Sequence, residues 1–240
     1  MQYILALVFF ACLVQICASS RPPVIVFVGA PFSGKGTQAD ILSARLSIPI
    51  LQSGDLFRTE VKSGSELGQK MAEYMNSGRL IPDEFTIDLI TKTLSSSSYA
   101  AGVIMDGYPR NLAHLEIFLG ILGNIDMAID AIIYLEANQD LLLSRVENRR
   151  TCQNCGRPIS IVSPQAEACC DNPSLIQRAD DTIEKFHKRY EIFQNETLEM
   201  IEKLSVDYPD KFIRIGSEIL ASANKEQVAE LIFSNVKSLL

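Results

Sequence analysis

A short stretch near the start of the chain has the residue types that bind the phosphates of a nucleotide. An apolar run at residues 24–28 leads into a glycine-rich loop that ends in Gly34-Lys35-Gly36-Thr37. In such a loop, successive backbone N–H groups surround an anion, and the following helix, predicted at 34–46, directs its positive dipole end to the same place. Lys35 then reaches the β- and γ-phosphates, and the Thr37 hydroxyl lies near the accompanying metal ion. The stretch therefore predicts a nucleotide site.

A second group with chemical potential follows a later strand. Residues 103–105 are apolar, Asp106 ends the run, and Gly107-Tyr108-Pro109-Arg110 follow directly. A carboxylate at the end of a strand beside a phosphate-binding loop orients hydrated Mg²⁺. An arginine suits phosphate because its charge is permanent and its guanidinium binds two oxygens at once. The pattern predicts that Asp106 acts on Mg²⁺ and Arg110 on a phosphate.

The elements that must position these groups alternate along the chain between apolar strands and helices. Strands are predicted at residues 24–28, 48–51, 103–106, 131–135 and 212–215. Helices are predicted at residues 34–46, 111–122, 139–150, 180–204 and 225–240. Such alternation is typical of a parallel sheet with helices on both faces. We therefore expect an α/β fold of the P-loop NTPase kind, doubly wound, with small inserted lobes.

One inserted lobe is predicted after the second strand. Residues 55–96 have a helical pattern, and glycines are expected to break it at Gly64, Gly68 and Gly78. Ser53 or Asp55 is expected to cap the first of these helices. A further helix is expected to begin near Pro82, since proline and acidic residues favour a first turn.

The N-terminus has the pattern of a targeting segment. Residues 3–18 are almost wholly apolar, too few for a comfortable membrane span, and Ala18-Ser19-Ser20 precede Arg21. This predicts a signal peptide at 1–20, a mature chain of 21–240, entry into the secretory pathway, and no stable membrane span after cleavage. No basic residue precedes the apolar run, so a retained signal anchor stays open. The chain would be cytoplasmic if the segment is not used.

Composition limits the class of protein. The 240 residues are 47% hydrophobic, which is enough to bury one large core, and the net charge is −7. An acidic protein is not expected to bind nucleic acid broadly. If it binds phosphates, it has to concentrate its arginines locally.

Several spaced motifs resemble those of the adenylate kinases, within the nucleoside monophosphate kinases. They are Gly29-Ala30-Pro31 with Gly34-Lys35-Gly36-Thr37-Gln38, Ser53-Gly54-Asp55 with Arg58, residues 61–68, Asp106-Gly107-Tyr108-Pro109-Arg110, and Arg178-Ala179-Asp180-Asp181. The resemblance covers residue 24 to the C-terminus, and the order of the motifs makes it far more specific than a lone phosphate loop. It implies a monomer that transfers a phosphoryl group reversibly from Mg·ATP to a monophosphate, with AMP as the first candidate.

The resemblance also implies lobes and residue roles. A lobe that binds the monophosphate is expected at 52–81 and a LID at 148–181, with the remainder as CORE. The implied donor site consists of Phe32, Ser33, Gly34, Lys35, Gly36, Thr37, Arg145 and Arg149. The implied acceptor site consists of Ser53, Arg58, Arg79, Leu80, Ile81, Gly107, Tyr108, Pro109, Arg110, His114, Arg178 and Arg189. The implied catalytic groups are Lys35, Asp106, Arg110, Arg149, Arg178 and Arg189.

Two departures from the family pattern leave the acceptor base open. His114 stands where adenylate kinases carry a glutamine that reads adenine. Asn111, directly after Arg110, stands where the UMP-CMP kinases also have an asparagine. Histidine both donates and accepts, so it is able to read adenine, although a surface histidine is an equal interpretation. The segment 78–84 and the long LID are closer to adenylate kinase. Phe32 replaces a usual glycine, which affects the geometry of the loop.

Four cysteines in the predicted LID have two interpretations. Adenylate kinases with a long LID often hold a structural Zn²⁺ there with two Cys-x-x-Cys or Cys-x-x-Asp pairs. By this resemblance the ligands are Cys152, Cys155, Cys169 and Asp171, with Cys170 as a rival to Cys169. In an oxidising compartment, disulfides among the same cysteines are the competing interpretation.

Two other classes of protein fit the sequence less well than a kinase does. A secreted module that binds nucleotides without catalysis would be expected to lose some of the charged groups, whereas Lys35, Asp106, Arg110, Arg178 and Arg189 are all present. A GTPase switch has no support, because the chain contains no Asn-Lys-x-Asp segment that reads guanine.

Overall fold

The structure is a computed structural model that describes residues 21–77, 79–162, 169–178 and 181–240. The predicted signal peptide at 1–20 lies outside the described residues, as do Gly78 and the motif residues 179–180. Within the described ranges, no helix combines the length and the apolar character needed to cross a membrane.

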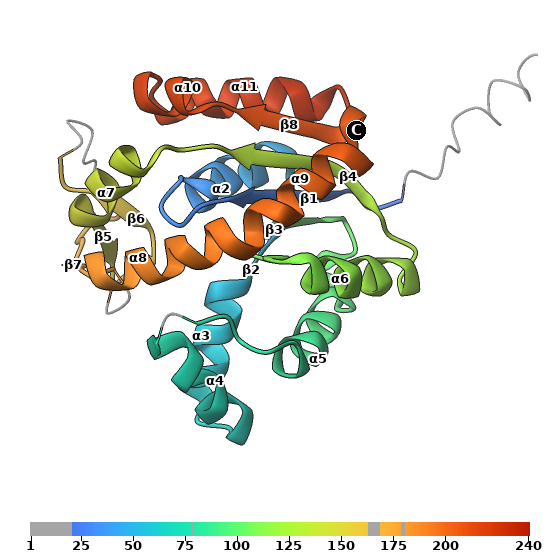
Figure 1. Cartoon of the computed structure of the whole chain (residues 1–240), viewed down its shortest axis with the longest axis horizontal. Helices are drawn as coiled ribbons and strands as arrows, with labels where there is room; N and C mark the ends of the chain where they lie inside the picture. The colour runs from blue at the N-terminus through green and yellow to red at the C-terminus, as the bar shows by residue number, and fades with distance from the viewer. Residues whose placement is uncertain (1–20, 78, 163–168, 179–180) are drawn as a thin grey trace, which may run out of the picture.

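A five-stranded parallel sheet forms the centre of the molecule (Figure 1). Its strands are β1 (Val24–Gly29), β2 (Ile50–Gln52), β3 (Val103–Asp106), β4 (Ile129–Leu135) and β8 (Phe212–Ile215), in the order β2-β3-β1-β4-β8. Every neighbouring pair is parallel, which confirms the predicted sheet. In a parallel sheet, the carboxyl ends of all strands meet at one edge, so the end of β1 lies beside the end of β3 and both face the same crevice.

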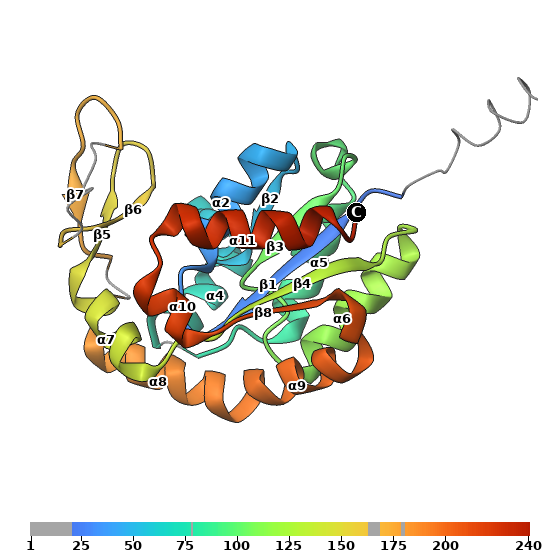
Figure 2. The ribbon, with the colours of Figure 1, turned by 90° about the horizontal axis from the view of Figure 1, so that it is seen from above.

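Residues of alternating parity in β1 pack on two different helical layers. Val24, Val26 and Val28 belong to the core cluster that includes α6 (Leu112–Asn124) and α9 (Leu198–Asp207). The intervening strand residues pack in a second cluster, with α2 (Lys35–Leu46) and α11 (Lys225–Lys237). The strand is therefore buried on both faces, which explains its unbroken apolar sequence. Figures 1 and 2 show α11 and α6 on opposite sides of the sheet.

Three helices follow β2 and project from the sheet, at the bottom of Figure 1: α3 (Ser53–Ser63), α4 (Glu66–Ser77) and α5 (Asp83–Leu94). The predicted break at Gly68 is wrong, because this glycine lies inside α4. A Cβ there would come within 2.2 Å of the Glu60 carbonyl oxygen, so the glycine lets α4 pack closely on α3.

The predicted side-chain cap at the start of α3 is also wrong. Ser53 already belongs to α3, whose N-cap residue, Gln52, makes no side-chain capping hydrogen bond.

A small antiparallel sheet lies at the other end of the crevice. It has the order β6-β5-β7, with β5 (Arg149–Cys152), β6 (Pro158–Ser160) and β7 (Leu175–Ile176). The predicted helix at 139–150 is too long, because α7 (Gln139–Asn148) ends where β5 begins to pair with its neighbours. All three strands fall in the segment 148–181 that is predicted as the LID.

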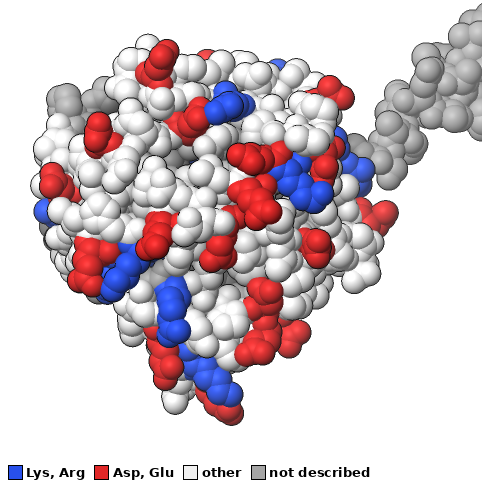
Figure 3. Space-filling view, viewed as in Figure 1, with Lys and Arg blue, Asp and Glu red and all other residues white. Residues whose placement is uncertain are grey.

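The helices of the C-terminal third were predicted only in part from the sequence. The helix predicted at 180–204 is divided into α8 (Ile183–Ile192), a π-helical turn (Phe193–Thr197) and α9. A short helix, α10 (Ser217–Ser222), follows β8 and was not predicted. On the face seen in Figure 3, acidic and basic side chains are interspersed and the acidic ones are more frequent, in agreement with the net charge.

Candidate active site

The carboxyl ends of β1 and β3, the helical lobe and the small antiparallel sheet line one cleft with a volume of about 1600 Å³. Most of the predicted site residues line it: Phe32, Ser33, Gly34, Lys35, Gly36, Thr37, Arg58, Leu80, Gly107, Pro109, Asp106, Arg110, Arg145, Arg149, Arg178 and Arg189. Four others, Arg79, Ile81, Tyr108 and His114, line a smaller adjoining pocket. Ser53 is fully buried at the start of α3. The structure thus brings the predicted residues together from both lobes and the central sheet.

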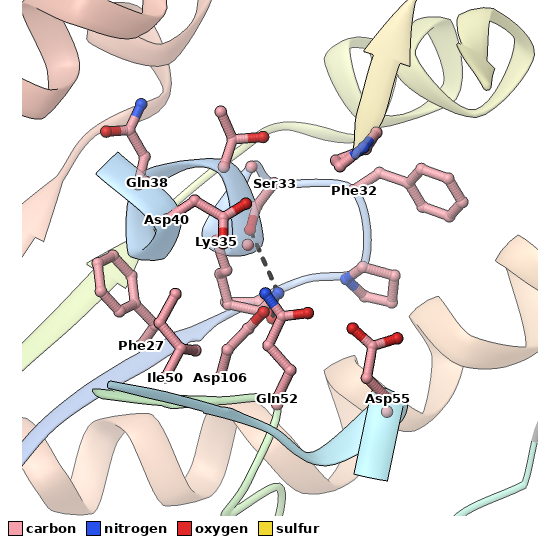
Figure 4. Close-up of a pocket in the computed structure, with 18 of the residues that line it drawn as sticks. Phe27, Phe32, Ser33, Lys35, Gln38, Asp40, Ile50, Gln52, Asp55 and Asp106 are labelled. Atoms are coloured by element: carbon pink, nitrogen blue, oxygen red, sulfur yellow. Dashed lines mark hydrogen bonds between the residues drawn. The ribbon is translucent and has the colours of Figure 1, made fainter. Parts of the chain in front are cut away.

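The phosphate-binding loop holds its lysine at the floor of the cleft (Figure 4). The Lys35 ammonium donates to the carbonyl oxygens of Gly29 and Ala30, each at 2.8 Å, and to the Ser33 hydroxyl at 3.4 Å. Gly34 has a φ of 102°, a left-handed value that a side chain would strain, and it is the N-cap of α2. The loop therefore turns tightly and leads directly into the positive end of the helix dipole.

Charged groups at this floor influence one another. The pKa of Lys35 is lowered to about 8, chiefly by removal from solvent; Asp106 acts against this shift, and Arg110, Arg189 and Arg149 contribute to it. Burial raises the pKa of Asp106, while the positive charges of Lys35 and Arg110 lower it. We name these five residues the phosphate centre. Four cations beside a single carboxylate favour the binding of a polyanion.

Phe32, the residue at the usual glycine position, keeps the left-handed geometry of a glycine, with a φ of 67°. Its ring is 8% exposed and packs edge-on against Phe186, with the ring centroids 5.9 Å apart. The guanidinium carbons of Arg149 and Arg189 lie 4.1 Å and 5.8 Å from the Phe32 centroid. The substitution therefore preserves the loop and adds an aromatic surface beneath two arginines of the phosphate centre.

Arg145 and Arg149 are both held by the chain itself. One nitrogen of Arg145 donates to the carbonyl oxygens of Phe32 at 3.2 Å and Ser33 at 2.7 Å, and another donates to Leu220 at 3.0 Å. Arg145 thus braces the loop, a role that its position in the sequence did not indicate. Arg149 donates through two nitrogens to the fully buried carboxylate of Asp181.

Three further arginines of the predicted site, Arg58, Arg79 and Arg110, contact nearby side chains and carbonyls. The Arg110 Nε donates to the Gly107 carbonyl oxygen at 2.6 Å. Arg58 donates to Asp55, with a distance of 3.0 Å from its Nε. The Arg79 guanidinium lies 4.7 Å from the ring centroid of Tyr74. All three guanidinium groups have contacts that a phosphate ligand is able to replace.

A second cavity, of about 80 Å³, adjoins the cleft, and we call it the acceptor pocket. Six residues line both cavities: Gly54, Arg58, Leu80, Gly107, Arg110 and Arg189. The other residues that line the acceptor pocket are Phe57, Met75, Arg79, Ile81, Thr86, Tyr108, His114 and Lys185. His114 is 4% exposed, which rules out the interpretation as a surface histidine. Its Nε2 lies 2.6 Å from an Asp83 carboxylate oxygen, and its ring centroid is 4.9 Å from that of Tyr108.

Two acidic residues that sequence reasoning missed hold these groups in place. Asp83 was interpreted only as an acid that favours the start of a helix, yet its carboxylate contacts His114. Asp181 was noted as part of a motif, but no role was assigned to its contact with Arg149. Neither contact has a local signal, because each joins residues more than thirty positions apart.

Four cysteine sulfurs of the small sheet and its loops lie within 4.8 Å of one another. The Sγ of Cys170 lies 3.7 Å from that of Cys152 and 3.9 Å from that of Cys169, and all four thiols are free in the described structure. The predicted ligand Asp171 is exposed and is not part of this group; Cys170 takes its place beside Cys155 and the other two. A tetrahedral metal with bonds of about 2.3 Å separates its sulfurs by about 3.8 Å, so the cluster fits Zn²⁺.

Comparisons with known proteins agree with this geometry. The family model described as adenylate kinase matches residues 27–207. The chain is 36% identical to an adenylate kinase of Clostridioides difficile over 90% of this chain and 97% of that protein. It is 36% identical to one of Caldicellulosiruptor bescii, over 86% of this chain and 98% of that protein. It is 34% identical to an adenylate kinase of Kosmotoga olearia, over 90% of this chain and 99% of that protein.

Proposed function

The chain belongs to the adenylate kinase family, and from that premise we propose that it transfers a phosphoryl group reversibly from Mg·ATP to AMP. The observation that carries the proposal is the phosphate centre, where Lys35 and three arginines converge at the carboxyl edge of the sheet. Relatives named adenylate kinase, matched over nearly their whole length, support the same reaction.

The chemistry needs alignment and positive charge more than covalent help from the protein. The accepting phosphate is already ionised near neutral pH, so no general base is required. Charge spreads over the equatorial oxygens of the transferring group, and cations fixed around it lower the barrier. Lys35 exchanges its carbonyl contacts for donor phosphates, and Arg110 binds the acceptor phosphate. Closure of the two lobes excludes water and so suppresses hydrolysis.

The residues at the floor of the cleft fit a Mg²⁺ ion that arrives with ATP. The carboxylates of Asp40, Asp55 and Asp106 line the cleft beside the phosphate-binding loop, and carboxylate oxygens and water are the ligands that Mg²⁺ prefers. Asp106 and the Thr37 hydroxyl would hold the ion through its water. When bound, Mg²⁺ neutralises charge on the donor phosphates.

An acceptor competition tests the proposal. The purified protein receives Mg·ATP and equal concentrations of AMP, UMP and CMP, and the products are separated by chromatography. We expect ADP to form from AMP alone, with no transfer by Lys35→Ala. Appearance of UDP or CDP would move the assignment to a pyrimidine kinase. Absence of any transfer that depends on Lys35 would favour a module that only binds nucleotides.

We propose further that the four-cysteine cluster holds a structural Zn²⁺, with Cys152, Cys155, Cys169 and Cys170 as ligands. Two sulfur separations, 3.7 Å and 3.9 Å, match the edges of a tetrahedral site, and all four sulfurs lie within 4.8 Å of one another, which supports the proposal. Metal analysis of the purified protein should give one Zn²⁺ per chain, retained by Asp171→Ala and lost by Cys170→Ser. Disulfides in place of free thiols, with no zinc, would establish the competing interpretation.

Entry into the secretory pathway also remains our proposal, and it rests on the apolar residues 3–18 and on the small residues 18–20 that precede Arg21. N-terminal sequencing of protein recovered from outside the cell should begin at Arg21. A chain that begins at Met1 and sediments with membranes would indicate a retained anchor. That the kinase is a monomer likewise stays a prediction, which its sedimentation velocity will test.

A further inference from the structure

The acceptor pocket contains a buried imidazole, that of His114, in which one ring nitrogen contacts a carboxylate and the other accepts and donates no hydrogen bond among the described residues. The Nε2 of His114 lies 2.6 Å from the Asp83 carboxylate, and among the described residues its Nδ1 has no hydrogen-bond partner. We propose that Asp83 fixes the tautomer of His114, so that Nδ1 accepts a hydrogen bond from the exocyclic amino group of the acceptor base. The inference rests on the proposed function and names a feature of its substrate: an amino base in preference to a keto base.

The tautomer follows from what each group is able to donate. An ionised carboxylate only accepts hydrogen bonds, so the proton of a neutral imidazole has to lie on the nitrogen that faces Asp83. Nδ1 is then left with a lone pair. Adenine and cytosine each present an amino donor at the corresponding ring position, whereas uracil and guanine present a keto oxygen. A keto oxygen would oppose the lone pair of Nδ1, and an amino group would satisfy it.

The imidazole is held on three sides, so it cannot readily turn to suit another base. His114 is the third residue of α6, and its backbone N–H donates to the Asn111 side chain at 2.8 Å. Asn111 in turn donates to Glu196 at 3.1 Å. The Tyr108 ring covers one face of the imidazole, and Asp83 holds Nε2 from α5. Orientation by a rigid frame is what allows one hydrogen bond to discriminate between ligands.

Four ionisable groups act on this imidazole from the elements around it. They are Asp83 on α5, Tyr108 and Arg110 in the loop after β3, and Glu196 in the π-helical turn. Burial, the largest influence, lowers the pKa of His114, and Arg110 acts in the same direction, whereas Asp83 and Glu196 oppose them. His114 is therefore neutral near pH 7, as the acceptor role requires. At acidic pH, Nδ1 gains a proton and becomes a donor, so the preference for an amino base should weaken.

The test compares AMP with purine riboside 5′-monophosphate, which lacks only the 6-amino group. For the wild-type protein, we expect kcat/KM for AMP to exceed that for the analogue about tenfold, the value of one well-placed hydrogen bond. In Asp83→Ala the ratio should fall to within about twofold, chiefly through the loss of AMP turnover. Asp88→Ala, which removes an exposed carboxylate from the same helix, is the matched control and should keep the wild-type ratio.

Two further measurements keep the proposal falsifiable if Asp83→Ala folds poorly. In the wild-type protein, the ratio should decline only at pH values below the ordinary range of histidine, because burial lowers the pKa of His114. In His114→Phe the ratio should be small and independent of pH. Binding of both nucleotides is measured by calorimetry in parallel, so that the preference is visible without turnover. A wild-type ratio near one, or a full ratio in Asp83→Ala, overturns the inference while AMP phosphorylation stands. If the protein binds AMP preferentially but transfers nothing, the proposed function fails and the inference does not.

Discussion

The phosphate centre and the acceptor pocket share Arg110 and Arg189 and differ in how their other polar groups are satisfied. In the phosphate centre, Lys35 contacts carbonyl oxygens of its own loop and Arg149 contacts Asp181. In the acceptor pocket, the Nδ1 of His114 and the hydroxyl of Tyr108 have no hydrogen-bond partner among the described residues. A charge cannot be buried without compensation, whereas a neutral polar atom costs much less to leave unpaired.

The difference separates the two tasks of the enzyme. In the function we propose, the phosphate centre acts on groups that every nucleotide carries, so a change there should affect all acceptors alike. The acceptor pocket, by the same proposal, acts on the base, so a change there should alter the preference between acceptors. In the phosphate centre, Lys35 already has internal partners and has to exchange them for phosphate. We therefore expect nucleotide binding to be linked to proton uptake at the phosphate centre and not at the acceptor pocket.

The largest effect is expected from Lys35→Met. Removal of a cation that stabilises the transferring group should lower kcat/KM about 100- to 1000-fold. Because Lys35 contacts phosphate and no base, AMP and purine riboside 5′-monophosphate should lose the same factor. Steady-state kinetics with both acceptors measure this, with Lys92→Met, an exposed lysine on α5, as the control. A loss that differed more than threefold between the acceptors would break the separation of the two regions.

A smaller effect, on stability, is expected from Phe32→Gly. Truncation of a buried phenylalanine costs about 3–5 kcal/mol, and release of a left-handed residue to glycine returns about 1–2 kcal/mol. Packing is the larger of the two, so the free energy of unfolding should fall by about 2 kcal/mol in urea titrations. Phe32→Ala loses the ring and keeps the strain, and should therefore be the less stable of the two variants. Equal or greater stability of Phe32→Gly would mean that the ring does not support the phosphate centre as its contacts indicate.

The same contrast explains how far sequence reasoning reached. Lys35 and Asp106 were predicted because their chemistry depends on local spacing and on the ends of fully buried strands. Gly68 was predicted at a helix break, Arg149 within a helix and Asp171 among the metal ligands. The structure differs at all three, because a helix contact, a strand pairing and a folded loop override local pattern. The contact between Asp83 and His114 joins two helices, so no local sequence pattern predicts it. The residues proposed for phosphoryl transfer therefore lie in contiguous motifs, whereas the residues proposed for base selectivity are brought together by contacts between distant segments.

The smallest effect is a fraction of a proton taken up when nucleotide binds. Lys35 has a pKa of about 8 in the protein without ligand, so at pH 8 about half of the molecules have a neutral amine. The phosphates of ATP, fully ionised at that pH, replace carbonyl oxygens beside the amine and raise its pKa. Binding should therefore take up as much as about half a proton, and affinity should fall as the pH rises through 8.

Calorimetric titration with ATP at pH 8, in two buffers of different ionisation enthalpy, measures this uptake directly. It should vanish in Lys35→Met and persist in His114→Phe, since His114 lies in the other region. Uptake that survived in Lys35→Met would place the titrating group elsewhere. Uptake that disappeared in His114→Phe would show that the two regions are coupled, and the division between chemistry and selectivity would then fail at the residues they share, Arg110 and Arg189.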